Sequence, residues 1–299
     1  MRLKSTFALL LLLSFFSIKA QKPIIFSEDS LKIGNGLLPS ISVVIPEVVY
    51  EKTLNDWIKT LQSGTKSKVV TENGEMTIFG AILKDITEFP VNAYSKLLDR
   101  DSVLYLAVTF EVKKDQYIER STGETELSRA KAFLFNFAKE QYTELVEDQL
   151  KAEQNKLRNL EKELGSLDKD KSGMEKSIRS NDKSITSEKD KLIALNNELT
   201  SLSAAIDEHR RVLSVMEPGE EKDEKTAYLK DLDKHKKQTI KAITKAENRI
   251  SKSERAIDKA KTDIPKTGKM QDNFRDQIDA QEAVVQKFTD KLNTVKAYR

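Results

Sequence analysis

The longest regular pattern in the chain begins at Val146, where apolar residues recur in alternating steps of four and three. It runs without a slip to Met216 and occupies two positions of a heptad, and 16 of its 21 positions are apolar. Spacing sustained over this length is typical of a coiled coil, because it places one narrow apolar seam along each helix. We therefore predict a helical outgoing leg over residues 146–216.

A second pattern of the same kind follows Pro218-Gly219 and is interrupted at residues 265–268. Two interpretations are open. The last segment could fold back to make a three-helix bundle, or the interruption could be a break within one return leg, residues 225–299. The similar lengths of the two legs favour the second, an antiparallel coiled-coil hairpin of roughly 100 Å. An acidic tip turn, residues 217–224, would then join the legs.

Both legs lose apolar character at the same level of this hairpin. With the turn centred near residue 221, Pro265 and Gly268 lie opposite a segment that contains Gly173 and the polar seam residue Lys171. Glycine and proline both weaken a helix interior. We therefore predict a joint formed by Gly173, Pro265 and Gly268.

The region before the heptads, residues 21–145, has a different pattern. Strict alternation from Val103 to Val112 predicts a half-buried strand, and Asn73-Gly74 predicts a tight hairpin turn. Residues 50–62 carry apolar side chains at helical spacing, and a second helix is expected to open at Ser121-Thr122-Gly123-Glu124. The predicted fold class is an α+β head domain, of about five strands and one or two helices, followed by the long antiparallel α-helical coiled-coil hairpin.

Residues 1–20 have the pattern of a signal peptide. Arg2 and Lys4 precede the apolar run Phe7–Ile18, and Ala20 is a small residue suited to cleavage. The run is shorter than the roughly 20 residues needed to cross a bilayer. We predict cleavage after Ala20, with an uncleaved anchor as the alternative. No Asn-X-Ser/Thr sequon occurs, which favours export into the periplasm or secretion from a bacterial envelope, with no integral membrane span after cleavage.

Composition narrows the classes of function. The chain has 51 Lys and Arg against 48 Asp and Glu, and the excess of three positive charges comes entirely from residues 1–20. A formally neutral exported chain argues against nucleic acid as a partner. There is no cysteine, and the head has no histidine, which removes the commonest general base and thiol nucleophile. We expect no enzymatic activity, no catalytic residues and no cofactor.

Weak candidates for metal ligands occur only in the legs. His209 and His235 are the only histidines, and the hairpin pairing would bring them close together among carboxylates. Asp168 and Asp170 match the first positions of a calcium loop, but Arg179 stands where its last acidic ligand belongs. Solvated polar positions on a long coil are the favoured interpretation of both sets, so no metal site is predicted.

Two charged segments are candidates for interaction. The predicted tip carries five acidic residues: Glu217, Glu220, Glu221, Asp223 and Glu224. The following stretch, Lys234–Lys269, holds 12 basic residues against four acidic ones. It could meet an anionic polysaccharide or a lipid headgroup, although an exposed coiled-coil face is the favoured interpretation.

These patterns predict an exported, non-enzymatic structural or interaction protein. Its coiled-coil arm would position or dock the small head against a protein partner in the cell envelope. The alternative is a ligand-binding module whose head binds a peptide, a glycan or an ion, with the coil as a dimerisation device. Trp57, Tyr94, Tyr105 and Tyr117 could stack on a sugar in that case, although core packing is the more frequent role of such residues.

Overall fold

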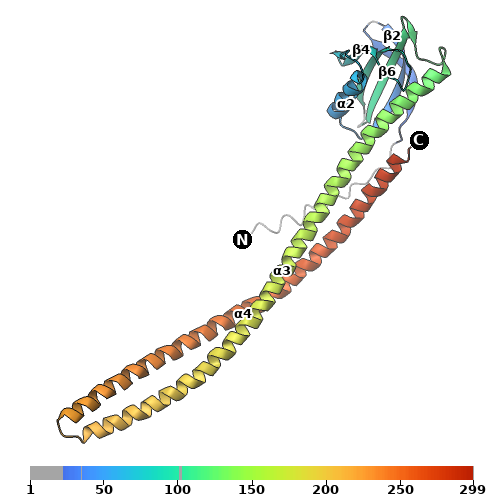
Figure 1. Cartoon of the computed structure of the whole chain (residues 1–299). Helices are drawn as coiled ribbons and strands as arrows, with labels where there is room; N and C mark the ends of the chain where they lie inside the picture. Colours follow the sequence, from blue (N-terminus) through green and yellow to red (C-terminus); the bar gives the residue numbers. More distant parts are fainter. Residues whose placement is uncertain (1–22, 35, 101–102, 299) are drawn as a thin grey trace. The chain divides into compact units, whose positions relative to one another are not determined.

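The computed structural model describes residues 23–34, 36–100 and 103–298, so the predicted signal peptide lies outside the described residues. Contacts divide the chain into two units: residues up to 155 together with 282–299, and residues 156–281. Each unit is described by itself (Figure 1). The strands are β1 (Phe26–Ile33), β2 (Gly36–Pro46), β3 (Val70–Glu72), β4 (Glu75–Ala81), β5 (Val91–Arg100), β6 (Val103–Lys113) and β7 (Gln116–Tyr117). The helices are α2 (Tyr50–Gln62), α3 (Glu124–Ser214) and α4 (Glu220–Lys296).

The head is an antiparallel sheet in the order β1-β2-β6-β5-β4-β3, with β7 paired to β6. The predicted hairpin turn is confirmed: Asn73 and Gly74 take the positive φ angles of 51° and 78° between β3 and β4. The predicted α+β class is confirmed as well. The strand β1 was not predicted, because it is a largely exposed edge strand with no apolar alternation.

One face of the sheet packs against α2 and the beginning of α3. Trp57 of α2 is fully buried, contacts the ring of Phe137 at 5.0 Å, and donates a hydrogen bond from Nε1 to Ser95 Oγ at 2.9 Å. Leu61 and Leu134 fill the same core from the two helices. The opposite face carries the alternate residues of the central strands, and we call it the open face because no helix of the described part of the chain packs on it. Ala107, Thr109 and Glu111 of β6 lie on this face but are only 4%, 1% and 8% exposed.

The second unit is the helical hairpin formed by α3 and α4. Three cross-helix contacts show that the helices are antiparallel: Arg210 to Asp233, Arg249 to Glu188, and Gln271 to Asp168. Every seam position predicted over 146–216 is buried or half-buried. The return leg of the hairpin is one helix, so the three-helix alternative is wrong.

The predicted break at 265–268 is also wrong, because α4 is helical from Glu220 to Lys296 with Pro265 inside it. The four-and-three spacing continues through Ile264, Thr267, Gln271 and Phe274, all of them buried or half-buried. Pro265 is exposed on the other side of the helix. It therefore costs a backbone hydrogen bond without displacing any seam contact.

The ends of the two helices meet in the first unit around a buried ion pair. Lys291 Nζ lies 2.6 Å from Glu47 Oε2, and the Lys291 side chain is only 6% exposed. The Lys291 ammonium also lies over the ring of Tyr142, which packs with Val146 and Val295. Glu47 has a φ of 62°, a conformation that costs a non-glycine residue energy. This cluster fixes the end of α4 to the loop that follows β2.

We expect Lys291→Ala to lower the free energy of unfolding by about 1–3 kcal/mol, because it leaves the half-buried Glu47 carboxylate without its ion-pair partner. The matched control is Lys296→Ala, one turn further on, whose partner Glu147 is about half exposed; this change should cost less than about 1 kcal/mol. Urea unfolding followed by the fluorescence of Trp57, the single tryptophan, measures both. Equal losses would show that the buried pair has no special role.

Candidate functional site

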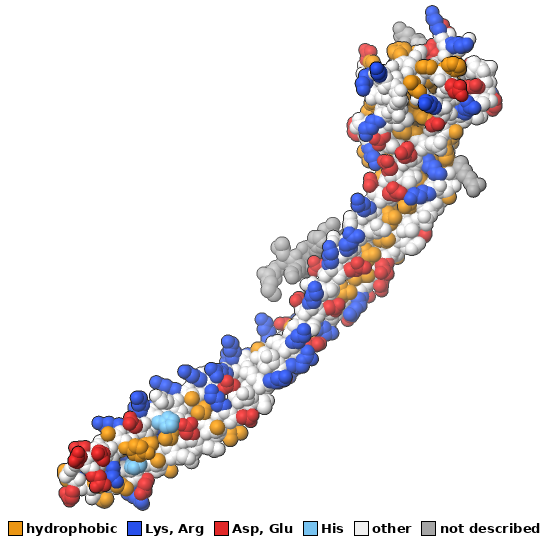
Figure 2. Space-filling model, in the orientation of Figure 1, with side chains coloured by type: hydrophobic (Ala, Val, Ile, Leu, Met, Phe, Trp, Pro, Cys, Tyr) orange, Lys and Arg blue, Asp and Glu red, His pale blue; other side chains and the backbone are white. Residues whose placement is uncertain are grey.

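The predicted acidic tip is a short turn and the first turns of a helix. Helix α3 ends at Ser214 and α4 begins at Glu220, so the predicted tip turn over 217–224 is too long. Pro218-Gly219 ends the turn, and Glu220, Glu221, Asp223 and Glu224 are already helical. Figure 2 shows acidic side chains gathered at this end of the hairpin.

All five predicted tip acids are exposed. Acidic residues in the first turn stabilise a helix, because its unpaired N–H groups carry partial positive charge. Lys222 Nζ donates a 2.7 Å hydrogen bond to the carbonyl oxygen of Met216, and Glu221 forms an ion pair with Lys225. Three of the five acids, Glu220, Glu221 and Asp223, therefore have a local structural role. Only Val215, whose side chain is 82% exposed, is an unexplained apolar group there.

A line of basic residues follows the outer side of α4, and we call it the basic ridge. Its members are Lys234, Lys237, Lys241, Lys245, Lys252, Arg255, Lys259, Lys266 and Lys269, all exposed. They recur in steps of three, four and seven, on the side of the helix opposite the seam. Asn248 and Thr262 occupy the remaining places in this spacing. Figure 2 shows Lys and Arg in a row along the α4 edge of the hairpin.

Several basic residues of the hairpin have acidic partners, whereas within the described part of the chain most of the ridge does not, and neither do the exposed α3 residues Lys162, Lys169, Lys176 and Lys183. Arg210 pairs with Asp233, Arg211 with Glu208, and Arg249 with Glu188. Of the nine ridge residues only Lys266 has an ion-pair partner among the described residues, Asp263 at 3.0 Å. The ridge is therefore an accumulation of positive charge that the ion pairs of the hairpin leave largely unneutralised.

The two histidines do not form one site. The ring of His209 packs edge-on against Tyr228 at 4.8 Å, two helical turns before His235 on α4. His235 Nε2 instead lies 2.8 Å from Glu198 Oε1. The level of His209 is therefore about 10 Å along the axis from that of His235. The sequence arithmetic misplaced them because the real pairing is shifted by about one turn.

The two aspartates of the calcium-like pattern do not form a joint site either. Asp168 accepts a 2.6 Å hydrogen bond from Gln271 Nε2 across the seam, while Asp170 is exposed. The helix runs through this segment, so the residues do not form a loop. Among the described residues no group of three or more His, Asp or Glu side chains is arranged to hold a metal ion.

The predicted joint coincides with a polar level of the seam. Gln271 is 3% exposed and Thr267 9%, where a coiled coil ordinarily carries apolar side chains. Lys171, half-buried on α3, lies close to this level. A Cβ added at Gly173 or at Gly268 would meet no atom within 4 Å, so close packing requires neither glycine. The helices are continuous here, and a joint stays a prediction about local stability.

The open face of the sheet carries a carboxylate that sequence analysis missed. Glu111 of β6 is 8% exposed and accepts hydrogen bonds from Asn92 Nδ2 at 2.8 Å, Tyr94 OH at 3.1 Å and the backbone N–H of Asp115 at 3.0 Å. The Asn92 amide is the main cause that holds the pKa of Glu111 below its usual range. Burial, followed by Glu111, raises the pKa of Tyr94 to about 12. The antiparallel register of β5 and β6 was the signal that could have paired Asn92 with Glu111.

An exposed aromatic ring lies beside this cluster. Phe79 of β4 is 59% exposed and contacts Tyr94 edge-on at 6.2 Å. Of the four aromatic residues that the sequence suggested, Trp57 belongs to the core, while Tyr94, Tyr105 and Tyr117 are half-buried. The cluster can accept or donate hydrogen bonds beside an aromatic surface, but its carboxylate already accepts three hydrogen bonds from within the head.

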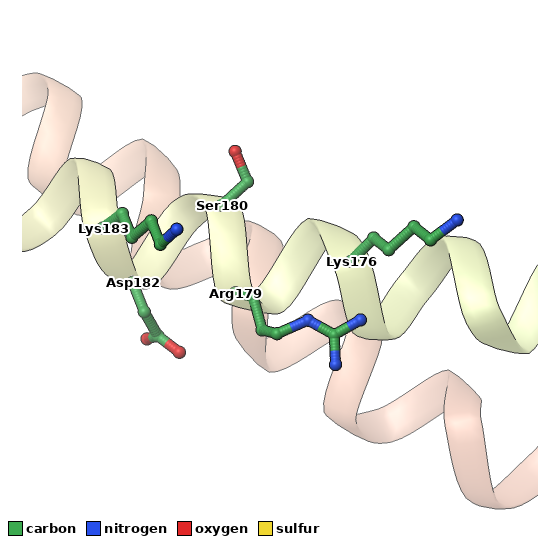
Figure 3. Close-up of a pocket in the computed structure, with 5 residues that line it drawn as sticks. All are labelled: Lys176, Arg179, Ser180, Asp182 and Lys183. Carbon is green, nitrogen blue, oxygen red and sulfur yellow. The ribbon is translucent and has the colours of Figure 1, made fainter.

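The hairpin also has a shallow depression along α3, lined by Lys176, Arg179, Ser180, Asp182 and Lys183. Figure 3 shows these side chains spread over the surface of one helix rather than converging on a point. Such an arrangement offers no enclosed volume in which a reacting group could be held away from water.

Comparison with known proteins assigns no family: no family model matches the chain, and no curated protein matches it significantly. None of the helices in the described part of the chain has an apolar stretch long enough to cross a bilayer.

Hydrogen exchange tests the joint. We expect backbone amides in 168–185 and 260–272 to exchange faster than those in 199–206 and 240–250, where every seam position is apolar. The reason is that the first level has polar seam residues and Pro265 supplies no N–H, whereas Leu202, Ile206 and Ala246 make the second level apolar and buried. Uniform protection along both helices would contradict the joint.

Removal of the Asn92 amide tests the Glu111 cluster. We expect Asn92→Ala to raise the pKa of Glu111 toward its ordinary value of 4.5. Ionised Glu111 stabilises the fold above that value, and the contribution is lost as the pH falls through the lower folded pKa. The variant should therefore lose stability at neutral pH and differ less from the parent in acid. Carboxyl carbon NMR titration measures the pKa, with Ser42→Ala on β2 as a control that should leave it unchanged.

Proposed function

We propose that this protein is an exported, non-enzymatic interaction protein whose helical hairpin docks the head domain to a partner in the cell envelope. The observation that carries the proposal is the basic ridge of α4. An isolated coiled coil needs charged outer positions for solubility, but mixed signs serve that purpose. A row of one sign, mostly without intramolecular partners, is better suited to an external partner of opposite charge.

The seam supports the same role. Residues 156–214 of α3 pair with α4 of the same chain, which gives a hairpin limb of about 90 Å within the second unit. A limb of this kind offers long outer faces that its own folding does not use. The signal-like pattern of residues 1–20 supports export, and the exposed tip supplies a second contact surface.

A ligand-binding head is the second candidate. The observation in its favour is the exposed Phe79 ring beside Tyr94 on the open face of the sheet. An aromatic surface flanked by hydrogen-bonding groups is typical of glycan or peptide contacts. Dimerisation through the coil is less well supported. The apolar side of α3 already packs against the apolar side of α4 within one chain, so neither is left for a second copy.

Export and docking can be tested in one strain. We expect fractionation to place the protein outside the cytoplasm, and N-terminal sequencing to find Gln21 first. A photo-crosslinking amino acid in place of Glu221 at the tip, or of Lys245 on the ridge, should form adducts in intact cells. The same residue in place of Thr200, exposed on α3, is the control and should not.

A cytoplasmic protein that retains residues 1–20 would contradict export. Equal adduct formation from Lys245, Glu221 and Thr200 would contradict docking through the tip and the ridge. If only a probe in place of Phe79 forms adducts, the ligand-binding head becomes the better description.

A further inference from the structure

We infer that the basic ridge of α4 binds a linear acidic polysaccharide. This inference rests on the proposed function, because export decides which anionic polymers the ridge can meet. Eight of the nine ridge residues have no ion-pair partner among the described residues, and Asp258 is the only acid that interrupts the outer face between them. Charge of one sign, exposed and unpaired, attracts a polyanion from solution and holds it at short range.

The spacing of the ridge suits a polymer with one charge per unit. Steps of three or four residues correspond to about 4.5–6 Å along the helix axis, and the two steps of seven, where Asn248 and Thr262 intervene, to about 10 Å. From Lys234 to Lys269 the ridge therefore extends for about 50 Å. A polyuronate carries one carboxylate on each sugar ring, so successive carboxylates can follow successive ammonium groups along this line. A small anion would contact only one or two of the nine basic residues.

The course of the ridge favours a flexible chain over a flat membrane. Because the ridge keeps the same four-and-three spacing as the seam, it stays opposite the seam and winds with the supercoil. With a supercoil pitch of about 150 Å, the ridge turns by about a third of a revolution over its length. A bilayer could contact only part of it at once. Surface-binding helices also insert a continuous apolar face, whereas the exposed large apolar residues of α4 along this stretch, Ile240 and Met270, lie 30 residues apart.

The residue types favour a carboxylate polymer over nucleic acid. Proteins that bind single strands combine basic grooves with aromatic side chains for base stacking. The ridge has no aromatic residue, and eight of its nine members are lysine rather than arginine. Lysine acts as a hydrated point charge without the planar fork that recognises phosphate in two places. Lysine ammonium groups require from their partner only a line of spaced negative charges, which a polyuronate supplies.

Binding of polygalacturonate to the purified protein tests the inference. The ridge variant carries Lys237→Gln, Lys241→Gln, Lys245→Gln and Lys252→Gln. The matched control carries Lys32→Gln, Lys84→Gln, Lys113→Gln and Lys114→Gln, which removes the same charge from exposed lysines of the head. Glutamine keeps the helix propensity of lysine, and circular dichroism checks that both variants keep the helices of the parent.

We expect calorimetry at low salt to show binding that weakens steeply as salt is added. The ridge variant should lose at least about tenfold in affinity and the control less than about twofold, because local rather than net charge holds the polymer. Neutral dextran should not bind. Equal losses in the two variants would overturn the inference, since net charge alone would then explain binding.

Two further probes separate the other occupants. Tighter binding of phosphatidylglycerol vesicles than of polygalacturonate would overturn the inference in favour of a lipid surface, and tighter binding of single-stranded DNA would overturn it in favour of nucleic acid. A protein that binds polygalacturonate but remains in the cytoplasm would leave the chemistry of the ridge standing and refute the proposed function. An exported protein that does not bind the polymer would refute the inference about the ridge and leave the proposed function standing.

Discussion

The apolar seam between α3 and α4 is the constraint on which the second unit depends. A two-helix coil has no other core, so each helix must keep one narrow side apolar for its whole length. Some polar seam residues form bonds across the two helices: Gln271 reaches Asp168, and Glu188 reaches Arg249 through one of its two oxygens. Others do not, since His209 Nδ1 is buried without a hydrogen-bond partner among the described residues. The narrow seam also leaves the outer side of each helix unused by folding, and so free to carry a different pattern. The basic ridge is such a pattern.

The seam was predictable from the sequence because it is long and periodic, and chance cannot sustain a register over ten heptads. The head was predictable where alternation or a turn signal was strong, as in β6 and at Asn73-Gly74. The strand β1 escaped because an exposed edge strand is held by backbone pairing, which leaves little trace in side-chain pattern. Pro265 misled the prediction because its helix-breaking tendency is local, while the seam on both sides of it is not.

The candidate surfaces differ in how far sequence could identify them. The excess of basic residues in Lys234–Lys269 could be counted from the sequence. That they lie on one side of the helix could be recognised only once the seam positions of α4 were known. The pairing of the histidines failed because the predicted centre of the hairpin loop is about two residues too late. An error in that centre moves every cross-helix partner by twice as much, here about one helical turn. The Glu111 cluster depends on the register between β5 and β6, which composition does not reveal.

The acidic tip and the basic ridge differ in how far folding alone explains them. Glu220, Glu221 and Asp223 stabilise the start of α4, and Lys222 donates a hydrogen bond to the carbonyl oxygen of Met216 in the turn. Folding alone therefore accounts for much of the tip. Folding gives no comparable account of the ridge, since like charges three and four residues apart repel and slightly destabilise a helix. Alternating opposite charges would keep the helix soluble without this repulsion. Nine basic residues along one line are therefore better explained by a bound polyanion than by solubility.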